Sequence, residues 1–173
     1  MKLTTDLFDQ TRRLTETQIT WILRHGNHAI QRLGGVGEVR IKVINDAEMA
    51  SAHEEFAGVT GTTDVLTFDM ADLEEHPRPT RPTVGEVGSD SVRNKYVLDT
   101  DILICIDEAD RQATPHGYPL ERELLLYVVH GILHCVGFDD HDEAEFVAMH
   151  AMEDTLLAVI GVGPVFHRPR IGD

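Results

Sequence analysis

The apolar segment of residues 120–136 leaves this chain few ways to fold. Its sequence, LERELLLYVVHGILHCV, has the pattern of a strongly apolar helix, and Gly137 directly after it suits the end of a helix. No run in the chain approaches the ~20 apolar residues that a membrane span requires. We therefore expect a packed helix here, and no membrane as a partner.

Shorter patterns predict the elements around that helix. Thr15 and Gln18 form a capping-box pattern at the start of a helix that would end at the glycines of residues 34–35. The other predicted elements are strands at residues 39–44, 64–68 and 102–106, a helix capped by Asp46 that ends near Gly58, and a helix capped by Asp142 and Glu145 that ends near Ala158. Strands in the first two thirds and two packed helices at the end predict an α+β fold, with a small mixed β-sheet packed with helices.

The chain shows no internal repeat and no linker, so its 173 residues predict a single domain, residues 1–173. Within it, residues 74–94 predict a loose surface excursion and residues 161–173 an irregular tail, because both stretches are rich in glycine and proline. Cys105 and Cys135 lie in apolar runs and are expected to be buried free thiols. Together with an N-terminus that has no apolar signal core, they favour a cytoplasmic location.

The formal net charge of −15 argues against a generic nucleic-acid binder, which usually carries surplus lysine and arginine to neutralise phosphates. Residues 43–77 hold many acidic side chains but no lysine or arginine, a composition typical of a solvated acidic face. A polyanionic substrate would therefore have to meet a local basic patch. The candidate patches are Arg78 with Arg81, Arg93 with Lys95, and Arg168 with Arg170.

Two histidines inside the apolar helix indicate a metal site. His130 and His134 are four residues apart, so both imidazoles project from one helix face with their Cβ atoms ~5–6 Å apart. At that spacing two ring nitrogens can bind one cation. Gly137 then ends the helix, and a third donor in the following turn, either His141 or Asp140, can fold back over the pair. Three ligands leave one position for water, which is typical of catalytic rather than structural zinc.

The other histidines are scattered and indicate no second site; His25 and His28 share a helix face but lack a third partner. Gly131 occupies the position at which the zinc-protease signature HExxH has its general base. A protease is therefore the weaker interpretation. Proton transfer falls to Asp140 if it is not a ligand, to another segment, or to the phosphate of the substrate.

Residues 130–139 (HGILHCVGFD) resemble the H-G-x-L-H-L-x-G-Y-D-H signature of the YbeY family of metal-dependent endoribonucleases. Residues 63–68 (TDVLTF) are similar to that family's T-D-V-L-S-F, and residues 101–113 to its G-D-I-x-I-S…Q-A stretch. Glu123 stands where the family has a glutamate seven residues before the first histidine. The matches are in order and correctly spaced over residues 41–150.

This resemblance implies a zincin-like α+β fold that binds one zinc ion per chain. It also implies a hydrolase, specifically an endonuclease that cuts single-stranded RNA during ribosomal RNA maturation and ribosome quality control. The implied partners are ribosomal RNA and the small ribosomal subunit, and not DNA.

Two positions depart from the family pattern. The third histidine of the family aligns with Asp140, whereas His141 follows one residue later. We favour His141 as the third ligand, because a loop absorbs one residue cheaply and imidazole suits zinc; a carboxylate would also work. Ala57 stands where the family has an arginine suited to gripping phosphate, and Arg111 or Arg122 would have to substitute for it.

The sequence is compatible with three functions. The leading one is a zinc-dependent endoribonuclease with His130, His134 and His141 as metal ligands and Asp140 as the candidate catalytic residue. The second is a metal-dependent hydrolase of a peptide or amide bond. The third is a ribosome-assembly factor whose metal is mainly structural; the acidic charge favours it, because a protein partner need not be anionic.

Overall fold

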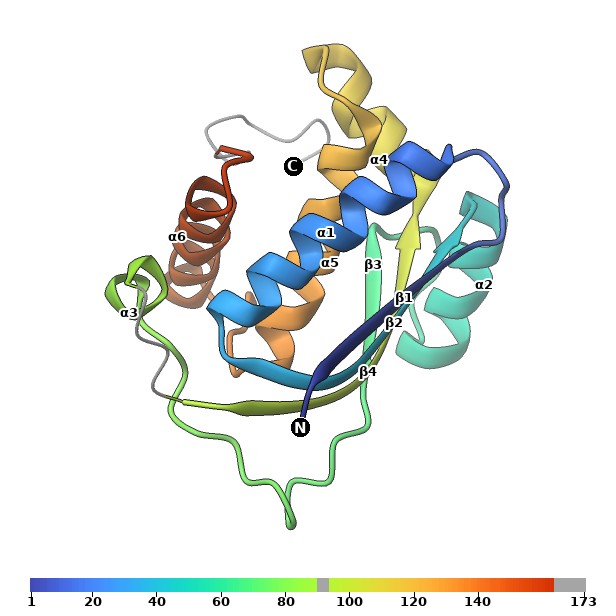
Figure 1. Ribbon diagram of the computed structural model, residues 1–173. Helices are drawn as coiled ribbons and strands as arrows, with labels where there is room; N and C mark the ends of the chain where they lie inside the picture. The colour runs from blue at the N-terminus through green and yellow to red at the C-terminus, as the bar shows by residue number, and fades with distance from the viewer. Residues whose placement is uncertain (90–93, 164–173) are drawn as a thin grey trace.

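The computed structural model describes residues 1–89 and 94–163 and has one mixed β-sheet with helices on both faces (Figure 1). The strands lie in the order β1-β2-β4-β3. Strands β1, β2 and β4 are parallel, and β3 pairs antiparallel with β4 at one edge. The strand bounds are β1 Leu3–Asp9, β2 Gly35–Ile44, β3 Val65–Asp69 and β4 Tyr96–Cys105. The predicted α+β fold with a small mixed sheet is confirmed.

Helices α1 and α5 cover one face of the sheet, and α6 packs beside them (Figure 1). Helix α2 lies on the opposite face, against β4. The helix bounds are α1 Glu16–Arg32, α2 Asp46–Ala57, α3 Val84–Gly88, α4 Ile106–Ala113, the short 3-10 helix η1 Thr114–His116, α5 Leu120–Cys135 and α6 Glu143–Val159. In the described residues, no helix is both long and apolar enough to cross a membrane.

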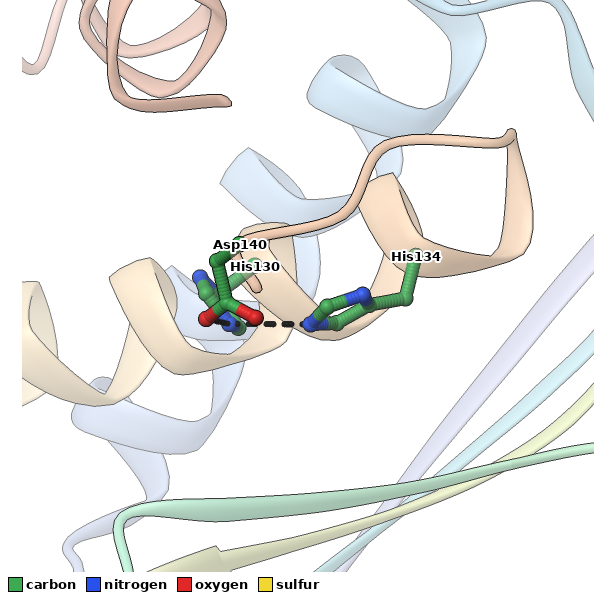
Figure 2. A group of neighbouring side chains, drawn as sticks. All are labelled: His130, His134 and Asp140. Carbon is green, nitrogen blue, oxygen red and sulfur yellow. Dashed lines mark hydrogen bonds and ion pairs between the residues drawn. The ribbon is translucent and has the colours of Figure 1, made fainter. Parts of the chain in front are cut away.

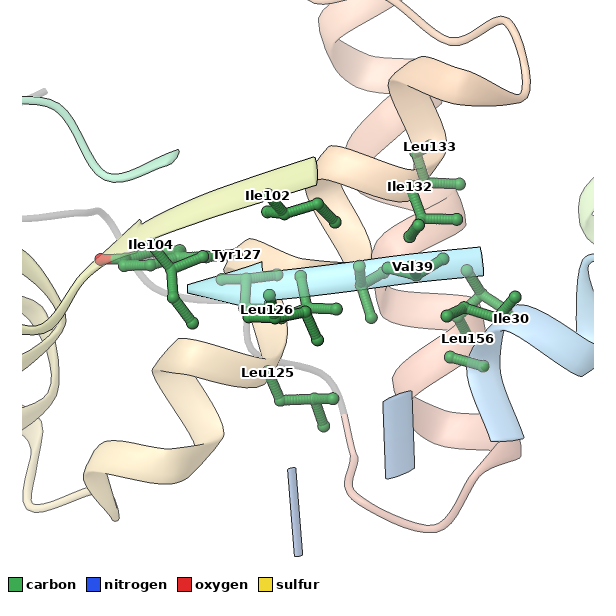
Figure 3. Close-up of a cluster of buried hydrophobic side chains, with 14 of the residues drawn as sticks. Ile30, Val39, Ile102, Ile104, Leu125, Leu126, Tyr127, Ile132, Leu133 and Leu156 are labelled. Carbon is green, nitrogen blue, oxygen red and sulfur yellow. The ribbon is translucent and has the colours of Figure 1, made fainter. Parts of the chain in front are cut away.

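Helix α5 is enclosed by the rest of the molecule. Eleven of its 16 residues are buried, and it contacts α1, α4, α6, β3 and β4. Figure 3 shows Leu125, Leu126 and Leu133 of this helix among side chains from the sheet and the neighbouring helices. Nearly every side of α5 buries apolar surface, and removing that surface from water is favourable. The strongly apolar sequence of α5 therefore explains its central position.

Strand β1 was not predicted, and its sequence explains why. Of its residues, LTTDLFD, the structure buries only Leu7. The strand lies at the edge of the sheet and pairs with β2 alone, so it is held mainly by backbone hydrogen bonds. An edge strand with one buried side chain leaves no alternating apolar pattern to detect.

The structure corrects one predicted helix cap. The side chain of Asn45, rather than that of Asp46, accepts the hydrogen bond from the backbone of Glu48 at the start of α2. Asp46 instead accepts two hydrogen bonds of 2.7 Å from Arg111, which lower the pKa of Asp46 to about 2. The sequence did not distinguish the two neighbours, because both have a short side chain with an acceptor oxygen. The predicted caps at Thr15 and Asp142 are confirmed.

The segment predicted as a loose excursion, residues 74–94, contains helix α3, which begins with a capping box of Thr83 and Glu86. The hydroxyl of Tyr96 donates to the carbonyl of Thr80 at 2.6 Å, so the segment is attached to the start of β4. Residues 90–93 lie outside the described part of the chain. Most of the predicted irregular tail, residues 164–173, does so as well.

Helix α5 lies close to the sheet at Gly131. A methyl group there would stand 2.6 Å from Thr67 Oγ1 and 3.4 Å from the side chain of Ile102. We expect Gly131→Ala to reduce the free energy of unfolding by about 1–3 kcal/mol, because the added methyl group overpacks this contact. Gly26→Ala in α1 is the matched control, since its methyl group would lie 3.9 Å from its neighbours. Urea denaturation of both variants measures the difference, and equal stability would show that the α5 contact can relax.

Candidate metal centre

The end of α5 and the loop after it place three possible metal ligands together (Figure 2). His130 and His134 lie on one face of the last turns of the helix. Gly137, with a φ of 98°, reverses the chain, and the backbone N–H of Phe138 donates back to the carbonyl of Leu133 at 3.0 Å. Such a left-handed residue after a helix is usually glycine, because it has no Cβ to clash. The reversal carries Asp140 over the two imidazoles.

The donor atoms of these three residues converge. The Nε2 atoms of His130 and His134 are 3.1 Å apart, and His130 Nε2 is 3.6 Å from Asp140 Oδ2. One donor atom from each residue lies within 4.8 Å of the other two. The two histidines predicted from the sequence therefore meet as expected from their helical spacing.

In each ring, the hydrogen bond made by Nδ1 indicates that Nε2 is the nitrogen without a hydrogen. His134 Nδ1 lies 3.2 Å from the carbonyl of Phe138, which can only accept, so this nitrogen carries the hydrogen. His130 Nδ1 lies 2.6 Å from Glu153 Oε1 and donates to that carboxylate. In the neutral rings both Nε2 atoms then present lone pairs to one another. Two facing lone pairs at 3.1 Å repel unless a proton or a metal cation lies between them. With the Asp140 carboxylate beside them, the donor set fits a divalent metal such as zinc.

The surroundings shift the pKa values of the two histidines in opposite directions. Burial lowers the pKa of His130, but its hydrogen bond to Glu153 and the nearby carboxylates outweigh burial and raise it. Burial and the neighbouring His130 lower the pKa of His134, so that ring favours its neutral form. A neutral imidazole is the form that binds metals.

Two cavities of about 380 Å³ each flank the histidine pair. Both are lined by Thr63, Asp64, His130 and Asp140. The residues that line only the first cavity are Thr62, Glu108, Phe146 and His150. The residues that line only the second are Val65, Leu66, Thr67, Asp69, Arg78, His134 and Cys135. The candidate ligands therefore lie between two spaces that are open to a substrate.

The structure brings Asp140, and not His141, to the histidine pair. The His141 side chain is 84% exposed, and its Nδ1 contacts the carboxylate of Asp139. Phe138 is buried, so the loop is anchored two residues before Asp140 and reaches the histidines at that position. The third ligand favoured from the sequence was His141; which of the two residues binds the metal stays a prediction.

The basic residues proposed to replace the family arginine lie away from the ligand group. Arg111 pairs with Asp46 and Glu108, and Arg122 lies over the ring of Tyr118, 4.5 Å from its centroid. Neither lines the two cavities. Of the basic patches noted in the sequence, Arg93, Arg168 and Arg170 fall outside the described residues.

Sequence reasoning did not place Arg78, Glu153 or His150 at this site, and it counted His150 among the scattered histidines. Arg78 was noted as part of a basic patch, but its place in the wall of the second cavity follows from the path of the 70–83 segment. Glu153 was not noted at all, because it lies on α6, 23 residues from its partner His130. Glu123, by contrast, is buried in the first turn of α5 and lines neither cavity.

Comparisons with known proteins indicate a family and support the fold. A family model described as Endoribonuclease YbeY matches residues 4–161. An Endoribonuclease YbeY of Halalkalibacterium halodurans is 30% identical over 165 residues, which cover 94% of this chain and 98% of the relative. Another, of Moorella thermoacetica, is 32% identical and covers 78% of this chain and 80% of the relative. The solution structure of TM1509 from Thermotoga maritima matches 90% of each chain with a TM-score of 0.53 at 18% identity, which supports the fold.

Proposed function

This chain belongs to the Endoribonuclease YbeY family, and on that premise we propose that it is a zinc-dependent endoribonuclease that cuts single-stranded ribosomal RNA. Membership of this family supports RNA cleavage as the class of reaction. The metal requirement depends on one observation, the two Nε2 atoms 3.1 Å apart with the Asp140 carboxylate beside them. We further propose the cytoplasm as its location and the small ribosomal subunit as its partner.

Some residues of the site would bind the metal, and others would bind RNA. His130, His134 and Asp140 would bind zinc, which supplies positive charge to polarise a phosphoryl oxygen and to lower the pKa of water. The Glu153 carboxylate and the backbone carbonyl of Phe138 hold the far side of the two rings. Asp64 and Asp140 make the walls acidic, so phosphate binds poorly unless a cation offsets them. In a chain of net charge −15, substrate binding should therefore depend on the metal.

The direct test is cleavage of an end-labelled single-stranded RNA by purified protein. We expect cleavage that a chelator abolishes and that added zinc restores, with little cleavage of duplex RNA or of single-stranded DNA. Robust cleavage by the metal-free protein would overturn the proposal. Turnover of a peptide in place of RNA would favour the other hydrolase, and metal binding with no turnover of either would favour an assembly factor.

Arg78 is expected to bind phosphate at this site. Among the described residues that line the two cavities, it is the one lysine or arginine. It is 36% exposed and pairs with Asp69, so its contribution to RNA binding is reduced by water and by that carboxylate. We expect Arg78→Ala to raise KM for RNA ~5–10-fold with kcat little changed, as for a lost charged hydrogen bond of about 1 kcal/mol. Steady-state kinetics would measure this rise in KM, with Arg24→Ala, at an exposed position of α1, as the control. An equal rise in KM in both variants would show that the effect comes from net charge and not from Arg78.

A further inference from the structure

A buried glutamate links the candidate metal centre to the last helix. Glu153 of α6 has 0% of its side chain exposed. Its two carboxylate oxygens are bonded to two different histidines, Oε1 to His130 Nδ1 at 2.6 Å and Oε2 to His150 Nδ1 at 2.9 Å. His130 and His150 both line the first cavity. The carboxylate therefore lies directly behind the ligand group.

Packing alone does not account for a glutamate at this position. The other side chains that α6 buries are apolar, namely Met149, Met152, Leu156 and Leu157. The helix thus holds a carboxylate, bonded to two histidines, in a place where an apolar residue would pack at lower cost. A group retained at such cost has a role other than filling space.

We propose that Glu153 is a positioning residue that aims His130 at the metal. By accepting the hydrogen of Nδ1, it selects the tautomer whose Nε2 lone pair faces His134 and Asp140. It also holds the plane of the ring, and an anion behind an imidazole makes the ligand nitrogen a stronger donor. His150 occupies the second oxygen, so the carboxylate cannot rotate away from His130. This inference rests on the proposed metal site.

Zinc affinity tests this role without any assay of RNA cleavage. Glu153→Gln keeps the size of the side chain but offers an amide in place of a charged acceptor, so we expect the dissociation constant for zinc to rise ~10–100-fold. Glu143→Gln removes the same charge from an exposed position of α6 and is expected to leave the affinity unchanged. Competition against a chromophoric chelator measures all three proteins. Wild-type protein that binds no zinc would overturn the metal site itself, whereas unchanged affinity in Glu153→Gln would overturn this inference alone.

The tautomer of His130 gives a second readout, which does not depend on the variant folding. Long-range nitrogen–proton NMR spectra of the metal-free wild-type protein, at a pH where the imidazole shifts no longer change, distinguish Nδ1–H from Nε2–H. We expect Nδ1–H for His130, and a shift toward Nε2–H in folded Glu153→Gln. Nε2–H in the wild-type protein would overturn the proposal, even if Glu153→Gln proves too unstable for the zinc titration.

Discussion

His134→Ala is expected to abolish metal binding and to reduce RNA cleavage by at least ~1,000-fold, because the catalytic charge is lost with the metal. The substitution removes one of two Nε2 donors that lie 3.1 Å apart. It leaves only the backbone carbonyl of Phe138 without its ring partner. His130→Ala should have the same effect on cleavage, but it also deprives the buried Glu153 of a partner and should destabilise the fold. His134→Ala is therefore the cleaner test.

Elemental analysis of the purified variant and its single-turnover cleavage rate measure these two losses. His28→Ala, at an exposed position of α1, is the matched control and should retain both metal and rate. A His134→Ala protein with one metal per chain and the wild-type rate would show that the imidazole pair is not the metal site.

Asp140→Ala and His141→Ala together identify the third ligand. Asp140 Oδ2 lies 3.6 Å from His130 Nε2, whereas the His141 side chain extends into solvent. We expect Asp140→Ala to weaken zinc binding ~100-fold, the effect of losing one of three protein ligands, and His141→Ala to change it less than ~2-fold. Asp140→His should bind zinc and remain active, because an imidazole at that point of the loop is also a suitable donor.

The same zinc titration decides between the two residues. The reverse pattern, with affinity lost in His141→Ala and kept in Asp140→Ala, would show that the loop after Gly137 rearranges when metal binds. It would also free Asp140 for the proton-transfer role considered from the sequence. Circular dichroism of both variants is the control for folding, and both positions lie at exposed parts of the loop.

The histidine pair could be predicted from the sequence because it depends on local geometry. A helix of 3.6 residues per turn places positions four apart on one face whatever the rest of the molecule does. The long apolar run had to be a buried helix for a similarly general reason, since its side chains gain free energy by leaving water. These two facts were enough to place His130 and His134 on one face of a core helix.

The third ligand could not be predicted in this way. Asp140 and His141 are neighbours in a loop, where no period relates a residue number to a direction in space. The choice depends on where Gly137 turns the chain and on the burial of Phe138, which anchors the loop before Asp140. Sequence spacing cannot resolve a shift of one residue in a loop, although that shift decides which side chain meets the two histidines.

By itself the sequence determined the helical pair, the apolar helix that holds it, and the α+β class. It did so through local periodicity and hydrophobicity, which act along the chain. The tertiary structure decided which loop residue meets the pair, that Arg78 of a surface segment lines the cavity, and that Glu153 of α6 stands behind His130. Each of these joins segments that are distant in sequence or lack regular structure, and only packing brings such segments together.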